Sequence, residues 1–309
     1  MSSIVTVTFN PAVDKSTTVS SLIPEKKLRC TEPVFEPGGG GINVARAIHK
    51  LGGQATAAYL AGGHTGKALI DLVSAENISS MASKIELNSR ENLVVYEDKS
   101  GSQYRFGMPG PKVKASEYQA LLQSIENVKN VEFIVVSGSI PDGIPPSIFS
   151  ELSRIAAFKN AQLVVDTSGE ALRYAVNSGV YLIKPNLREL ASLAGQENVE
   201  PGQAVNLAKE VLRKGTCKFI ALSMGSEGAL LISEDLEIRV VPPPVKIQST
   251  VGAGDSMLGG LVYSLSQGKS INEAIHYGVA CGTAATLNAG TELCRKDDAD
   301  RLYKLILKE

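Results

Sequence analysis

From residue 54 onward, short apolar runs alternate with longer segments in which apolar residues recur at helical spacing. The short runs predict strands and the longer segments predict helices. The expected strands are 55–60, 133–136, 162–166, 180–183 and 219–222, and the expected helices are 65–76, 117–127, 148–158, 170–177, 187–193 and 205–214. This alternation is typical of a parallel sheet with helices on both faces, so the pattern predicts an α/β fold.

The two ends of the chain extend this pattern. Residues 4–9 predict a central strand, which residues 10–14 end in a loop. The last third predicts an antiparallel pair over 229–232 and 238–241, then helices over 258–267, 272–287 and 297–308. No linker or repeat divides the chain, so residues 1–309 are expected to form a single domain.

Four further β-rich runs interrupt the alternation and predict a small separate sheet. The predicted strands are 16–23 and 28–35, joined by 24–27, and 88–97 and 103–108, joined by 98–102. The lid therefore takes its strands from about 16–35 and 88–108. A sheet without helical cover would expose one face, so we expect a homodimer through this lid.

Charge and composition narrow the class of protein. The chain has 31 basic and 32 acidic residues among 309, so it lacks the excess of positive charge that is typical of proteins that bind nucleic acid or a membrane surface. Residues 1–5 lack the basic and apolar regions of a signal peptide. The four scattered cysteines predict reduced thiols in the cytoplasm, and the three histidines lack zinc-ligand spacing.

The stretch Gly252-Ala253-Gly254-Asp255 stands where a polar turn enters an apolar helix. Small residues there let backbone N–H groups approach an anion, and the helix N-terminus adds partial positive charge. A carboxylate beside a phosphate cradle is unfavourable unless it has a catalytic use. Asp255 is therefore a candidate base that takes the proton of the nucleophile, although a first-turn acid of an ordinary helix would look the same.

A second glycine cluster, Gly38 to Gly41, precedes a helix that runs to about Leu51. The cluster predicts backbone packed against a ligand, and Asn43 in the first turn could contact a sugar hydroxyl. The spacing of a dinucleotide-binding fingerprint is missing, which argues against a dehydrogenase. Asp14 lies just past the first strand, where open α/β sheets place ligands.

Other polar turns follow the predicted strands at 137–139, 166–168, 184–189 and 223–228. Parallel strands share a direction, so these turns should meet at one edge of the sheet. Each turn alone is typical of a cap or a bend. Their convergence with residues 252–255 favours a small-molecule site.

Taken together, residues 38–47 and 248–260 resemble the motifs of the ribokinase-like sugar kinases of the phosphofructokinase B type. The resemblance covers essentially the whole chain. Within that family it is strongest to the 6-phosphofructokinases of the isozyme 2 type, as carried by residues 27–31, 35–38, 104–106, 108–110 and 240–246. It implies a three-layer α/β/α fold with a β-sheet lid, and MgATP-dependent phosphorylation of fructose 6-phosphate at the C1 hydroxyl.

The resemblance also implies roles for individual residues. Asp255 would be the catalytic base, and Gly252, Ala253 and Gly254 the anion hole. The sugar phosphate would be held by Asp14, Lys27, Arg29, Gly39, Gly40, Asn43, Arg90, Arg105 and Ser139. ATP would be bound by Lys184, Asn186, Ser223, Gly225, Gly228, Val279 and Thr283. Asn186 and Glu189 would organise Mg²⁺ through water.

One position departs from the family pattern. The family often has an acidic residue three places before the first glycine of the anion hole, and here that residue is Ser249. In relatives this position lies near a monovalent cation. The resemblance thus implies a K⁺ site near Ser249, Val251, Ala285, Asn288 and Gly290.

Three alternatives remain open on the sequence. 1-Phosphofructokinase and tagatose-6-phosphate kinase share the chemistry and differ in how the sugar is held. A sugar-phosphate sensor that binds without turnover is a third, and the presence of Asp255 beside an intact Gly-Ala-Gly argues against it.

Overall fold

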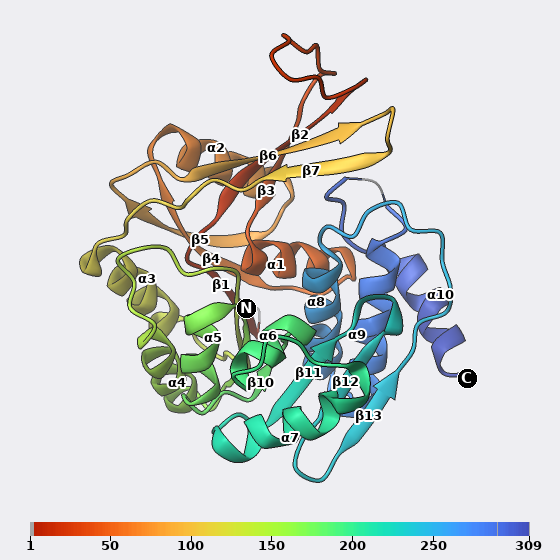
Figure 1. The fold of residues 1–309 in the computed structure, drawn as a ribbon. Coiled ribbons are helices and arrows are strands. Elements are labelled where there is room, and N and C mark those ends of the chain that lie inside the picture. Colours follow the sequence, from red (N-terminus) through yellow and green to blue (C-terminus); the bar gives the residue numbers. More distant parts are fainter. Residues whose placement is uncertain (1–2, 289, 309) are drawn as a thin grey trace.

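The computed structural model describes residues 3–288 and 290–308 of the chain. A nine-stranded sheet runs through its centre in the order β13-β12-β11-β10-β9-β8-β1-β4-β5 (Figure 1). The strands are β1 Ile4–Thr8, β4 Thr56–Gly62, β5 Ser79–Ile85, β8 Phe133–Ser137, β9 Gln162–Asp166, β10 Leu182–Ile183, β11 Phe219–Ser223, β12 Ala229–Ile232 and β13 Glu237–Val240. Every pair from β5 to β11 is parallel, while β12 and β13 are antiparallel, as predicted.

Helices cover both faces of this sheet, so the predicted three-layer α/β/α architecture is confirmed. The helices of one layer are α1 Gly40–Lys50, α2 Gly63–Ala75, α8 Ala253–Ser266, α9 Ile271–Ala285 and α10 Lys296–Ile306. The helices of the other are α3 Ala115–Asn127, α4 Ile148–Phe158, α5 Gly169–Val176, α6 Leu187–Leu193 and α7 Ala204–Lys214.

Alternation along the strands divides the buried side chains between two cores. In β1, Ile4 packs with the α1 and α8 layer, whereas Val5 and Val7 pack with the α3 and α4 layer. All five residues of β1 are buried, which matches a central parallel strand covered on both faces.

The smaller sheet has the order β3-β2-β6-β7 and lies apart from the central sheet (Figure 1). Its strands are β2 Ala12–Val19, β3 Val34–Gly38, β6 Arg90–Glu97 and β7 Ser102–Phe106. Strands β2 and β6 pair in parallel, and β3 and β7 pair antiparallel at the edges. A separate four-stranded lid was predicted correctly.

Several boundaries of this lid were predicted wrongly. The first strand begins at Ala12, so Asp14 lies within β2 and not in a loop. Residues 20–33 form the connection to β3, anchored to β2 by a bridge between Val19 and Cys30. The prediction failed because Thr17 and Thr18 use hydroxyl and backbone hydrogen bonds to hold Thr31, which an apolar pattern does not reveal.

The lid is also less bare than expected, because α2 packs against β2 and β3. Strand β5 was missed, since Ser79, Ser80 and Ser83 give it no apolar alternation at the sheet edge.

Cys30 is exposed, while Cys217, Cys281 and Cys294 are buried. Within residues 3–288 and 290–308, no helix combines the length and apolar character needed to cross a bilayer.

The carboxyl ends of the parallel strands meet at one edge, as expected. Ser137 ends β8, Asp166 ends β9, and Ser223 ends β11. The N-termini of α1 and α8 face the same edge, with Asn43 on α1 in contact with Asp255 on α8. This edge lies beneath the lid and contains the candidate site.

Candidate active site

The turn before α8 has the geometry of an anion site. Gly252 caps the helix with φ 73°, a left-handed conformation that favours glycine. A Cβ there would also lie 2.5 Å from Leu293 Cδ2, so a side chain is excluded on two grounds. The first-turn N–H groups of a helix have no partner within it, so those of Ala253, Gly254 and Asp255 lie at a point of partial positive charge.

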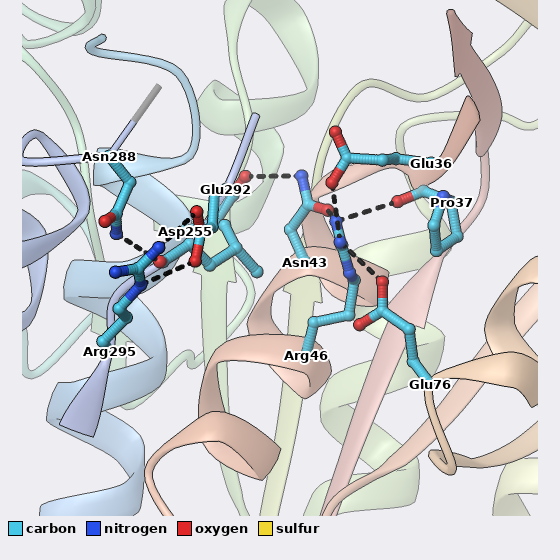
Figure 2. Close-up of polar contacts among 10 residues, drawn as sticks. Glu36, Pro37, Asn43, Arg46, Glu76, Asp255, Asn288, Glu292 and Arg295 are labelled. Carbon is cyan, nitrogen blue, oxygen red and sulfur yellow. Dashed lines mark hydrogen bonds and ion pairs between the residues drawn. The ribbon is translucent and has the colours of Figure 1, made fainter. Parts of the chain in front are cut away.

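Asp255 lies in the first turn of α8 and is half-buried. Asn43 Nδ2 on α1 donates a hydrogen bond of 3.0 Å to Asp255 Oδ2 (Figure 2). Burial, reinforced by the nearby Asp166 carboxylate, raises the pKa of Asp255 to about 6 against the opposing influence of Asn43 and Lys184. A carboxylate with this pKa is ionised at neutral pH and can still accept a proton.

Lys184 supplies a buried cation next to this carboxylate. Its ammonium forms an ion pair of 3.1 Å with Asp166 Oδ2, and a Cβ on Gly254 would lie 3.4 Å from Lys184 Nζ. Burial opposes the charge of Lys184, but Asp166 and then Asp255 raise its pKa above the ordinary value. The cation is therefore held charged against the first turn of α8.

The glycine cluster before α1 packs first against protein. A Cβ on Gly40 would lie 2.2 Å from Ser137 Oγ, and one on Gly41 would lie 2.4 Å from Val7 O. Gly39 has φ 117° and turns the chain into the helix. These glycines let α1 start against the ends of β1 and β8, which brings Asn43 to the site.

Two predicted sugar-binding residues, Asp14 and Arg105, share one face of the lid. The register of β2, β6 and β7 puts Asp14 opposite Asn92, and Arg105 opposite Val94, on that face. Asn92 Nδ2 donates a hydrogen bond of 2.8 Å to Asp14 Oδ1. Burial is the main reason that the pKa of Asp14 is raised.

Arg90 and Ser139 lie where the lid meets the central sheet. Arg90 Nη2 donates to Asn10 O at 3.0 Å, and its Nη1 donates to Met108 O at 3.1 Å. Asn10 Nδ2 in turn donates to Ser139 Oγ at 2.9 Å. Two of the buried polar atoms here, Arg90 Nε and Asn10 Oδ1, have no hydrogen-bond partner among the described residues.

The other cations predicted to bind the sugar phosphate lie in two different places, with Arg105 apart from Lys27 and Arg29. Arg105 Nη2 reaches Thr250 Oγ1 at 3.4 Å, close to the start of α8. Lys27 and Arg29 lie exposed on the connection 20–33, which extends beyond the lid away from the central sheet (Figure 1). Neither forms an ion pair in the part of the chain that the structure describes.

A groove of about 580 Å³ adjoins the anion site and is lined mainly by apolar atoms. It contains five of the predicted ATP-binding residues, Ser223, Gly225, Gly228, Val279 and Thr283. Sequence reasoning missed its other walls, which are Ser226, Pro242, Pro243, Pro244, Val245, Ile247, Thr250, Met257, Gly282 and Thr286. The Pro-Pro-Pro run was the available signal, because proline has no backbone N–H with which to continue the pairing of β13.

Lys184 and Asn186, the other two predicted ATP-binding residues, do not line this groove. Asn186 caps α6: its Oδ1 accepts from Glu189 N at 3.0 Å, and Glu189 Oε2 accepts from Asn186 N at 2.8 Å. Burial is the main cause that raises the pKa of Glu189. Asn186 and Glu189 therefore have a structural role as the capping box of α6, in addition to any ligand that they bind.

Four of the five candidate K⁺ residues come from two adjoining loops, and the fifth, Ala285, is the last residue of α9. Ser249 Oγ donates to Gly290 O at 2.7 Å and accepts from Val251 N at 3.2 Å. Asn288 N donates to Ala285 O at 3.2 Å, and Asn288 Nδ2 to Leu293 O at 2.9 Å (Figure 2). Across the described residues, no three His, Cys, Asp or Glu side chains cluster as metal ligands.

Comparison with known proteins identifies the family of this chain. The family model for pfkB family carbohydrate kinases matches residues 4–298. The chain is 44% identical to ATP-dependent 6-phosphofructokinase isozyme 2 of Escherichia coli (strain K12), over 97% of each chain. It is 29% identical to 1-phosphofructokinase of Borreliella burgdorferi, over 97% of this chain and 96% of that one.

Solved structures agree with these matches. The crystal structure of phosphofructokinase-2 from Escherichia coli with potassium superposes with a TM-score of 0.94 at 43% identity, covering 99% of this chain and 100% of that one. The structure of the same enzyme with substrates and products has a TM-score of 0.92 at 42% identity, covering 98% and 99%. The chain therefore belongs to the pfkB family of carbohydrate kinases.

Proposed function

We propose that this chain transfers the terminal phosphoryl group of ATP to the C1 hydroxyl of fructose 6-phosphate, giving fructose 1,6-bisphosphate and ADP. The observation that carries the proposal is the position of Asp255. Its carboxylate lies in the first turn of α8, next in the chain to Ala253 and Gly254 of the groove, and Arg105 of the lid reaches Thr250 just before that helix. The relatives named 6-phosphofructokinase isozyme 2 support this choice of substrate.

In the proposed reaction Asp255 removes the proton of the C1 hydroxyl. The C1 oxygen forms a bond to the terminal phosphorus of ATP, and the bond from that phosphorus to the bridging oxygen breaks. The bridging oxygen leaves with ADP, and the protonated Asp255 later releases its proton to solvent. The raised pKa of Asp255 makes it a stronger base than an exposed carboxylate would be.

The first turn of α8 and Lys184 act on the charge of the transferring group. Backbone N–H groups at the start of α8 can bind phosphoryl oxygens, because helix geometry leaves them without a partner inside the helix. Lys184 adds a full positive charge against Gly254. Preorganised donors of this kind stabilise charge that builds up in the transition state.

Mg²⁺ would enter with ATP. The oxygens of Asn186 and Glu189 fit an outer position, because each side chain already has one oxygen in the capping box and retains lone pairs for a bridging water. When bound, the ion neutralises phosphate charge.

The K⁺ site is the second proposed ion site. The loops around Ser249 and Gly290 fit a monovalent cation by their carbonyl oxygens, and the related enzyme from Escherichia coli was solved with potassium. The hydroxyl of Ser249 is bonded to the Gly290 carbonyl where relatives often carry an acid. The hydroxyl therefore shapes the loop, while the missing carboxylate charge would weaken the attraction for the cation.

We further propose a cytoplasmic homodimer that forms through the lid. Phe35 on β3 and Phe106 on β7 are 46% and 45% exposed. The register places them with Lys15 and Leu93 in one row across all four strands. Pairing of two such rows would bury apolar surface and would bring the exposed Lys27 and Arg29 of one protomer toward the other.

Release of ADP with a panel of sugar phosphates tests the proposed substrate. Fructose 6-phosphate should give the highest kcat/KM, above fructose 1-phosphate, tagatose 6-phosphate and fructose. Faster turnover of fructose 1-phosphate would favour a 1-phosphofructokinase instead. Tight sugar-phosphate binding with no ADP release would favour a sensor.

A further inference from the structure

Arg46 is a buried arginine on α1 that lies one turn beyond Asn43. Its Nη2 forms ion pairs with Glu76 Oε1 at 2.6 Å and with Glu36 Oε1 at 3.1 Å. Its Nη1 donates to Pro37 O and to Asn43 Oδ1, each at 3.3 Å (Figure 2). Only 5% of its side chain is exposed, whereas its acidic partners are 22% and 27% exposed.

These contacts fix which way the Asn43 amide faces. A guanidinium carries only donors, so the Asn43 atom that faces Arg46 has to be the oxygen. The amide nitrogen then has to face Asp255, whose carboxylate carries only acceptors when ionised. Arg46, Asn43 and Asp255 thus form one chain of hydrogen bonds with a single direction (Figure 2).

The direction of this chain matters for the base. An N–H that donates to a carboxylate favours its ionised form, and the hydrogen bond from Asn43 opposes the effect of burial on Asp255 more than the one from Ser137 does. If the amide turned over, its oxygen would face the carboxylate and favour the protonated form. Without Arg46 on its oxygen, the Asn43 side chain would be held in this orientation only by its hydrogen bond to Asp255.

We infer that Arg46 is a positioning residue for the catalytic base: its guanidinium locks the Asn43 amide so that Nδ2 faces Asp255 and keeps that carboxylate ionised. The same guanidinium holds Glu36 and Pro37 O of lid strand β3. One side chain therefore aligns the lid, α1 and the base. This inference rests on the proposed function of Asp255.

Charged and polar groups from several elements surround the two ends of this hydrogen-bond chain. Asp166 and Lys184 face Asp255 from the ends of β9 and β10, and Ser137 faces it from β8. Glu36 from β3, Glu76 from the end of α2 and Asp14 from β2 face Arg46. A substitution of Arg46 changes none of these side chains; it removes the donors to Asn43 Oδ1 and Pro37 O and the ion pairs with Glu36 and Glu76.

The test is a carbon-13 NMR titration of the Asp255 carboxyl in the unliganded protein, with Asp255→Asn to assign the signal, together with the pH profile of kcat/KM. Arg46→Met should raise the pKa of Asp255 and move the acid limb of kcat/KM upward by about one pH unit, from the loss of an oriented charge-assisted hydrogen bond. Glu76→Gln is the matched control. It weakens the Arg46 cluster without touching Asn43, so it should lower thermal stability and leave the pKa of Asp255 in place.

A double-mutant cycle with Asn43→Ala tests whether Arg46 acts through Asn43. In that background Arg46→Met should add no further shift. If Arg46→Met alone does not fold, Arg46→Met with Glu76→Gln removes the cation together with an acidic partner and takes its place in the test. A folded variant with lower stability but an unmoved Asp255 pKa would overturn the inference. The NMR titration does not depend on turnover. An inactive wild-type protein would therefore refute the proposed function, while the shift in the pKa of Asp255 would still test whether Arg46 orients Asn43.

Discussion

Arg105 on lid strand β7 reaches Thr250 in the loop before α8, with 3.4 Å between Arg105 Nη2 and Thr250 Oγ1. Gln103 Oε1 holds the same guanidinium through Nε at 3.3 Å and Nη2 at 3.1 Å. The contact joins the lid to the wall of the groove, since Thr250 lines that groove. Under the proposed function, Arg105 would contact the sugar phosphate beneath the lid.

Replacement of Arg105 by alanine should raise KM for fructose 6-phosphate by about tenfold to a hundredfold. The reason is that a charge-assisted hydrogen bond from a guanidinium to a phosphate contributes roughly 1.5–3 kcal/mol. KM for ATP should change far less. Steady-state kinetics with each substrate varied in turn measures both, and Arg154→Ala on the exposed surface of α4 is the control. Equal increases for the two substrates would contradict a sugar-phosphate role.

Arg90→Ala should differ from Arg105→Ala in its effect on stability. Arg90 also holds Asn10 O and Met108 O, so its loss should raise KM for the sugar phosphate and lower the thermal midpoint as well. The stability cost should be on the order of 1–3 kcal/mol, because the Asn10 carbonyl loses the donor of a part-buried hydrogen bond. Calorimetry beside the kinetics checks this. An Arg90→Ala protein with an unchanged midpoint would show that these two hydrogen bonds contribute little.

The activity should fall on the acid side near pH 6. Burial raises the pKa of Asp255 to about 6, so the carboxylate is protonated below that pH and cannot take the hydroxyl proton. Because the free enzyme is the species concerned, kcat/KM should rise with pH through about 6 and level off above it. Rate measurements from pH 5 to 8 report this limb. A profile that stays flat down to pH 5 would remove Asp255 from the role of base.

Phe106→Asp should convert the proposed dimer to a monomer and reduce activity. Phe106 lies in the row with Lys15, Phe35 and Leu93, and a carboxylate in place of its ring would remove apolar surface from the paired rows and add a charge to be buried. Tyr96→Asp is the control, because the register places Tyr96 on the opposite face of the same hairpin. Sedimentation equilibrium should give a dimer for the wild type and for Tyr96→Asp. A wild-type monomer with full activity would refute the lid interface.

The sequence predicted the elements whose burial is uniform. The buried runs of β1, β8 and β9 were predicted to within one residue at each end, because a strand covered on both faces reads as a continuous apolar run. The edge strand β5 and the connection 20–33 could not be predicted in this way. Their pairing depends on serine and threonine hydrogen bonds and on neighbours that are distant in the chain.

The candidate site, like the fold, was predicted only in part from the sequence. Motif position led to Asp255, Asn43 and the residues of the anion hole, since short spacing along a helix start carries that information. The orienting role of Arg46 was not predicted, because it depends on Glu36, Glu76 and Asn43 meeting around one guanidinium. The wall formed by Pro242, Pro243 and Pro244 was missed as well, since only the folded chain shows what lies opposite it.

The most direct test of Asp255 as the base is kcat of Asp255→Asn with saturating ATP, Mg²⁺ and fructose 6-phosphate, beside calorimetric binding of both substrates. Asparagine keeps the shape and can still accept the hydrogen bond from Asn43. We predict that kcat falls by about 10²–10⁴-fold while both substrates still bind, because a positioned base contributes on that order to the rate. A folded Asp255→Asn enzyme with kcat close to that of the wild type would contradict this role of Asp255.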